Sequence, residues 1–129
     1  MFEESEWAEG VLEQRDLNEL LIHDRTATFI LRVAGRSMEN VGIFDGDHVL
    51  LDRSLDPHHG DVVVAVLNGE LTLKTLDLGG EETVLRAESG IFPNIHLDEH
   101  TSFRVLGVVT TSLRHLRQKH AMTQTPPRV

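Results

Sequence analysis

The dipeptide Asn68-Gly69 is the sequence feature that most restricts the fold of this chain. It stands between two apolar-rich runs, residues 61–67 and 71–78. Asn-Gly between such runs is typical of a two-residue hairpin with a type I′ turn, which needs a positive φ at both turn residues. Counting outward from the turn places Val63 opposite Lys74, and opposed residues share one face of a sheet. The sequence therefore predicts an antiparallel hairpin with a defined register.

Other short runs of strand-forming residues follow along the chain. They cover residues 28–33, 48–52, 83–86 and 103–111, and turn-forming groups such as Gly79-Gly80 separate them. Many short strands with almost no helix favour an all-β domain.

A single short helix is predicted over residues 16–22, near the start of the chain. Asp16 is a suitable N-cap, and Glu19 stands at the spacing of a capping box. The leucines of this segment share one face of the helix. We therefore expect a helix ahead of the first strand.

The 129 residues suit one domain with a single core, because a chain of this length buries about two-thirds of its surface on folding. Residues 13–112 are expected to form this domain. Residues 1–12 are acidic, carry the apolar anchor Trp7 and are expected to form an N-terminal arm. Residues 113–129 end in a polar, proline-containing stretch and are expected to form a flexible tail.

Composition argues against several classes of protein. The net charge of −9 argues against a general nucleic-acid binder, which needs a surplus of Lys and Arg to neutralise phosphates. The chain has no cysteine, which excludes disulfides, a thiolate nucleophile and thiolate metal sites. It has no apolar stretch of about 20 residues, and it starts with acidic residues where a secretory signal is basic. We therefore expect a soluble, cytoplasmic protein.

The eight histidines raise the question of a metal site. His96 and His100 are four residues apart, a spacing that brings two ligands together only on a helix, and Pro93 argues against a helix there. The chain also has no glycine-rich phosphate cradle, since the segment Asp45-Gly46-Asp47 is acidic. We therefore expect neither a metal nor a cofactor.

Ser37 follows a glycine at the end of a predicted strand, in the segment Gly35-Arg36-Ser37-Met38. A glycine permits a sharp change of direction, after which the serine begins a turn whose backbone N–H groups point outward. A hydroxyl beside free donors suits a nucleophile with an oxyanion hole. A serine in this position is more often a turn or helix cap, so the segment alone leaves both interpretations open.

Lys74 occupies an unusual place for a cation, because the predicted register sets it beside Val63. A lysine on a strand usually points to water. Burial would instead lower its pKa, because the charged ammonium loses solvation, and a neutral amine can take the proton of a serine hydroxyl. Asp61 lies diagonally from Lys74 in the same register, where a carboxylate would favour the charged amine. We expect Asp61 to point away or to be bound by other partners.

Two ordered segments carry a family resemblance. Gly35 to Asp47, with Asp52 after it, resembles the serine segment of the LexA/UmuD family of self-cleaving peptidases. Gly60 to Val66, followed by Gly69 to Leu76, resembles the family's lysine segment. The resemblance covers most of the chain, from about residue 13 to residue 109. The segments that resemble UmuD more than LexA are Glu13 to Leu21 and Val105 to Val109.

The resemblance implies a fold and a set of residue roles. Ser37 matches the family's nucleophile, and Lys74 matches the general base that deprotonates it. The backbone N–H groups of Ser37 and Met38 are the expected oxyanion donors. The implied fold is a compact, mainly antiparallel β-clip domain of the LexA/signal-peptidase-like kind, which forms homodimers.

UmuD-like members imply a role in the SOS response to DNA damage. A RecA–single-stranded DNA filament stimulates self-cleavage of their N-terminal arm, and the trimmed dimer joins a UmuC-like Y-family polymerase in error-prone translesion synthesis. In these precursors a cleavable Cys-Gly or Ala-Gly bond precedes the region that matches residues 7–12. Here almost nothing precedes that region, and Ala34-Gly35 lies on the strand that presents Ser37. We therefore expect the trimmed, UmuD′-like form, without direct DNA binding.

Two alternatives stay open. The chain could be a binding module, that is, a processed regulatory subunit that works through its dimer surfaces and no longer uses the serine and lysine. It could also be the peptidase domain of a LexA or phage-type repressor, separated from its DNA-binding domain.

Overall fold

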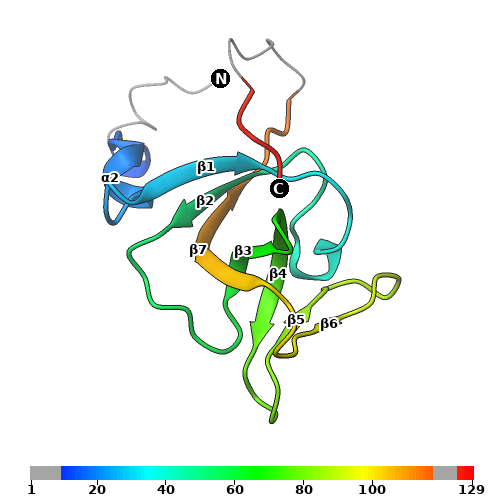
Figure 1. Cartoon of the computed structure of the whole chain (residues 1–129). Helices are drawn as coiled ribbons and strands as arrows, with labels where there is room; N and C mark the ends of the chain where they lie inside the picture. The colour runs from blue at the N-terminus through cyan, green and yellow to red at the C-terminus, as the bar shows by residue number, and fades with distance from the viewer. Residues whose placement is uncertain (1–9, 118–124) are drawn as a thin grey trace.

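Seven strands form one sheet within residues 10–117 and 125–129, the residues that the computed structural model describes. Their order is β1-β2-β7-β3-β4-β5-β6, and neighbouring strands are antiparallel (Figure 1). The strands are β1 (Thr28–Arg32), β2 (His48–Asp52), β3 (Val62–Leu67), β4 (Glu70–Asp77), β5 (Val84–Arg86), β6 (Ile95–His96) and β7 (Phe103–Leu113). The predicted all-β, mainly antiparallel fold is confirmed.

Strands β3 and β4 form the predicted hairpin. Asn68 and Gly69 have φ angles of 49° and 84°, the two positive values that a type I′ turn requires. Val63 pairs with Lys74 in the observed register, as the count from the turn predicts. The turn chemistry therefore determines which residues stand beside the lysine.

Strand β7 joins the two halves of the sheet, because it pairs with β2 on one side and with β3 on the other. Its register shifts once against each partner, which marks β-bulges, and Figure 1 shows the strand curving between the two halves. Gly107 lies at the crossing with β2. A Cβ atom on Gly107 would lie 2.8 Å from the backbone oxygen of Asp52, so the close approach of these strands requires glycine.

Strand β3 is buried on both faces. Val63, Val64 and Ala65 are each 0% exposed. Val64 belongs to an apolar cluster with residues of β1, β2 and β4, whereas Val63 and Ala65 belong to a second cluster with Leu76 and Leu85. Because β4 is the hairpin partner of this buried strand, a cation on β4 lies close to apolar side chains.

The predicted helix is present as one turn, α2 (Leu17–Leu21). The Asp16 carboxylate caps it by accepting a 2.9 Å hydrogen bond from the Asn18 N–H. None of its residues is fully buried: Leu17 and Leu20 are exposed and Leu21 is half-buried. A short 3₁₀ helix, η1 (Glu39–Val41), follows the serine segment and was not predicted. Within residues 10–117 and 125–129, no helix has the length and apolar character needed to cross a membrane.

Residues 125–129, at the end of the predicted flexible tail, lie along β1. Their backbone forms hydrogen bonds of 2.7 to 3.0 Å with Arg32 and Ala34. The physical reason is that β1 is an edge strand, whose outward N–H and C=O groups lack a partner within the sheet. The acidic arm up to residue 9, with Trp7, and residues 118–124 lie outside the described residues. The division of the chain at residues 12 and 112 stays a prediction.

Candidate functional site

Ser37 lies in the loop between β1 and η1. Gly35 starts this loop with a φ of 103°, a conformation that residues with a side chain rarely adopt, and its N–H donates a 2.7 Å hydrogen bond to Asp45 Oδ1. Met38, directly after the serine, is only 1% exposed and packs in the first apolar cluster. The loop is thus fixed on both sides of a half-buried serine.

Lys74 reaches Ser37 from the neighbouring hairpin. Its Nζ lies 3.3 Å from Ser37 Oγ, 3.1 Å from Thr72 Oγ1 and 3.1 Å from the backbone oxygen of Leu73. Burial lowers the pKa of the Lys74 ammonium below its ordinary value, because the charged form loses solvation. The structure therefore brings the two predicted side chains together in one hydrogen-bonded pair.

The carboxylate of Asp61 is engaged elsewhere, as the sequence analysis expected. It accepts a 2.8 Å hydrogen bond from the His58 N–H in the turn before β3. Across the described segments, no carboxylate lies within ion-pair distance of Lys74 Nζ. Nothing there offsets the effect of burial on the amine with an opposite charge.

The backbone around the serine offers hydrogen-bond donors. The carbonyl oxygens of Ser37 and Met38 both accept bonds, from Glu88 and from Val41 and Ile43. Their N–H groups donate to no acceptor within the part of the chain that the structure describes. Two successive N–H groups beside the serine are thus without an acceptor in the described residues.

Ser37 and Lys74 line a pocket of about 160 Å³. The other lining residues come from the serine loop, from β4 and from the far end of the described chain. They are Val33, Ala34, Gly35, Met38, Leu71, Thr72, Leu73 and Val129. Ser37, Lys74 and the backbone of Met38 were predicted from the sequence, but nothing in the sequence indicated Val129.

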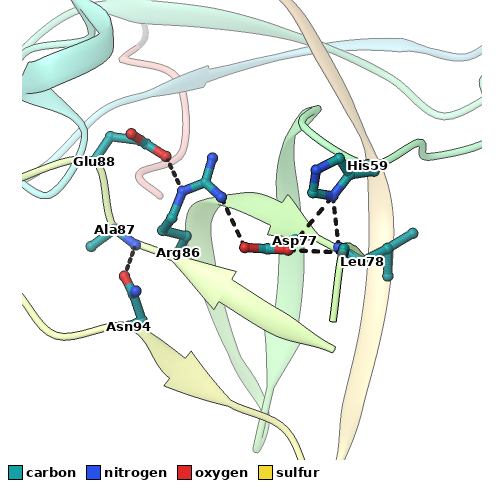
Figure 2. Close-up of polar contacts among 8 residues, drawn as sticks. His59, Asp77, Leu78, Arg86, Ala87, Glu88 and Asn94 are labelled. Carbon is teal, nitrogen blue, oxygen red and sulfur yellow. Dashed lines mark hydrogen bonds and ion pairs between the residues drawn. The ribbon is translucent and has the colours of Figure 1, made fainter. Parts of the chain in front are cut away.

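The serine loop is also held from the side of β5. The N–H of Glu88 donates a 2.8 Å bond to the Ser37 carbonyl, and the Glu88 carbonyl accepts a 2.7 Å bond from the Asn40 N–H. Figure 2 shows the Arg86 side chain between Glu88 and Asp77, with Arg86 Nε 2.6 Å from Glu88 Oε1 and Arg86 Nη1 2.9 Å from Asp77 Oδ2. Hydrogen bonding to Glu88 raises the pKa of Arg86.

These supporting residues were not predicted from the sequence. Arg86 and Glu88 are two residues apart, a spacing that places side chains on the same face of a strand. This spacing does not reveal the contact with Ser37, because Glu88 makes that contact through its backbone N–H. A backbone contact of this kind does not depend on the type of residue, so it cannot be predicted from the sequence. Asn94, which lies in a separate loop, was also not predicted: its side-chain oxygen accepts a 3.0 Å hydrogen bond from the Ala87 N–H (Figure 2).

The histidines do not gather into a metal site among the described residues, where no group of three His, Asp or Glu side chains is placed to hold an ion. His96 lies on strand β6, with its Nδ1 2.6 Å from Glu82 Oε1. The four-residue spacing to His100 therefore does not fall on a helix.

Comparison with known proteins gives consistent results. The family described as Peptidase S24-like matches residues 3–110. Protein MucA of Salmonella typhimurium is 39% identical over 108 residues, which cover 82% of this chain and 73% of MucA. Protein ImpA of the same organism is 34% identical over 114 residues, covering 82% of this chain and 72% of ImpA.

The LexA repressor of Pseudoalteromonas atlantica is 38% identical over 91 residues, 70% of this chain but only 44% of the repressor. This chain therefore spans less than half the length of that relative. The matches to MucA and ImpA cover a larger share of this chain and of the relative's own length.

Proposed function

Because the chain belongs to the Peptidase S24-like family of self-cleaving serine–lysine peptidases, we propose that Ser37 is its nucleophile and Lys74 its general base. The observation that carries this assignment is the 3.3 Å distance between Ser37 Oγ and Lys74 Nζ. The lowered pKa of Lys74 supports it, since only the neutral amine has a lone pair to accept a proton.

The proposed reaction begins when Ser37 Oγ attacks the scissile carbonyl carbon and its proton moves to Lys74 Nζ. The new C–O bond converts the carbonyl into an oxyanion, which accepts hydrogen bonds from the N–H groups of Ser37 and Met38. The tetrahedral intermediate collapses, the C–N bond breaks, and the leaving amine takes the proton from Lys74. Water, deprotonated by Lys74, then hydrolyses the acyl-enzyme.

Thr72 orients the base in this scheme. Its hydroxyl oxygen accepts a 3.1 Å hydrogen bond from Lys74 Nζ, and the Leu73 carbonyl accepts another at the same distance. A neutral amine has two N–H bonds. With both donated to Thr72 and Leu73, its lone pair is left to accept the Ser37 proton.

We further propose a UmuD-like role in the SOS response, as a homodimer that acts with a UmuC-like Y-family polymerase and is stimulated by a RecA–single-stranded DNA filament. MucA and ImpA are homologues of UmuD, and they match this chain over most of its length. Co-purification with a Y-family polymerase tests this role. The second candidate, the peptidase domain of a repressor, rests on the LexA match and predicts no polymerase binding.

The catalytic assignment is tested by supplying an arm-bearing UmuD-type precursor whose own serine has been replaced by alanine. We expect Ser37→Ala and Lys74→Ala to abolish its cleavage, a loss of at least about 10³-fold, because both groups act in the same step. Ser112→Ala, which removes an exposed serine on β7, is the matched control and should cleave normally. Wild-type rates from Lys74→Ala would overturn the assignment.

A further inference from the structure

The outer edge of β1 presents free backbone groups next to Ser37. β1 is the first strand of the sheet, and hydrogen bonding alternates along it and its continuation. Val33 bonds inward, with its N–H to Asp47 and its C=O to Gly46. Arg32 and Ala34, on either side of Val33, therefore direct their N–H groups away from the sheet, toward the groove that leads to the serine.

Residues 125–129 occupy this edge as an added strand. The Arg32 N–H donates to the Pro127 carbonyl at 2.7 Å, the Val129 N–H to the Arg32 carbonyl at 2.9 Å, and the Ala34 N–H to the Val129 backbone oxygen at 3.0 Å. Arg32 and Arg128 are register partners in a parallel arrangement. Figure 1 shows this segment, in red, running beside the end of β1.

Val129 carries the segment into the pocket. Its half-buried side chain packs against the first apolar cluster, and it lines the same 160 Å³ pocket as Ser37 and Lys74. The opposite wall of the pocket is formed by Leu71 to Leu73 of β4. The outer edge of β4 is unpaired there, because β5 pairs only with Thr75–Asp77. The groove thus runs between two strand edges, a shape that takes an extended peptide.

The segment is held weakly. Pro126 and Pro127 have no N–H to donate, and the two register partners Arg32 and Arg128 carry the same charge, which disfavours their pairing. Three backbone hydrogen bonds and one apolar side chain make up the attachment. Such a segment opens at a low free-energy cost compared with the buried strands.

We infer that residues 125–129 are a built-in competitor for the peptide-binding groove, so that a peptide to be cut must displace them from the edge of β1. The inference rests on the proposed function for the identity of the displacing ligand. The occupancy of the groove by residues 125–129 does not depend on catalysis and can be measured separately.

The first test is amide hydrogen exchange in the full chain. Val129→Asp places a charge in the half-buried position and should release the segment, so that the Arg32 and Ala34 amides exchange about tenfold faster or more. The Val33 amide, which bonds to Asp47, should stay unchanged and reports that the strand itself is intact. Arg128→Ala, which changes an exposed side chain, is the matched control and should leave all three amides protected.

The second variant is the chain that ends at residue 124, in which Arg32 and Ala34 should behave as in Val129→Asp. Adding the peptide Thr-Pro-Pro-Arg-Val should restore their protection, and it should not bind the wild-type chain. Equal protection of Arg32 and Ala34 with and without the segment would overturn the inference. If neither chain cleaves a precursor but the exchange pattern holds, the proposed catalysis fails, and only the occupancy of the β1 edge by residues 125–129 stands.

Discussion

At the scale of single residues, Lys74 shows that a side chain suited to catalysis can be unfavourable for the stability of the fold. Its ammonium is half-buried and has only neutral acceptors around it, from Ser37, Thr72 and Leu73. Burial of a charge without an opposite charge is unfavourable, and it lowers the pKa of the amine. The same cost that weakens the fold increases the neutral fraction of the proposed base.

The pKa of Lys74 predicts the pH dependence of cleavage. The neutral amine is the active form, so the rate should rise with pH and level off above the pKa of Lys74. Because burial lowers this pKa from 10.5, the midpoint should lie below that value. Single-turnover cleavage of a supplied precursor, measured as a function of pH, gives the midpoint. A rate that is flat with pH, or that falls as pH rises, would contradict the role of Lys74.

At the scale of elements, the strands were predictable because their signals are local. Asn68-Gly69 set the β3–β4 register, and through it the position of Lys74 beside Val63. Strand β6 has only two residues and left no pattern to detect. The placement of Val129 depends on an edge that exists only after the sheet has formed, so no local signal could reveal it.

Gly107 gives a stability prediction for the strand that joins the two halves. Gly107→Ala would place a Cβ 2.8 Å from the Asp52 backbone oxygen, so backbone must move. We expect a loss of about 1–3 kcal/mol in the free energy of unfolding, measured by urea denaturation. Gly90→Ala, at a loop glycine whose Cβ would meet nothing within 4 Å, is the control and should change little. Equal effects at both positions would show that the β2–β7 crossing is not tight.

At the scale of the whole molecule, an ion pair fastens the end of β7 to the loop before β2. Asp47 is 2% exposed and binds Arg114 through two contacts, at 2.8 Å to Nε and 2.9 Å to Nη2. The Arg114 guanidinium also lies 4.3 Å from the centre of the Phe44 ring. Hydrogen bonding to Arg114 lowers the pKa of Asp47 from 3.8. The pair therefore contributes stability above that pH and loses it in acid.

Arg114→Ala should lower the free energy of unfolding at neutral pH, because it leaves the Asp47 carboxylate with fewer hydrogen-bond donors. The cost should shrink as pH falls below 3.8 and Asp47 becomes protonated in the native wild-type chain. Thermal unfolding at a series of pH values measures this difference. Arg117→Ala, at an exposed arginine three residues later, should have no comparable effect. A cost that is independent of pH would indicate that packing on Phe44, rather than the charge, is what is lost.

The place of β7 in the strand order affects when the Ser37–Lys74 pair can form in the nascent chain on the ribosome. Ser37 and Lys74 are both synthesised before Phe103, yet the halves that carry them are joined in the sheet by β7, which ends at Leu113. Translation therefore delivers the hydroxyl and the amine long before the strand that brings them into register. We therefore expect the Ser37–Lys74 pair to assemble only after the chain has been synthesised as far as Leu113.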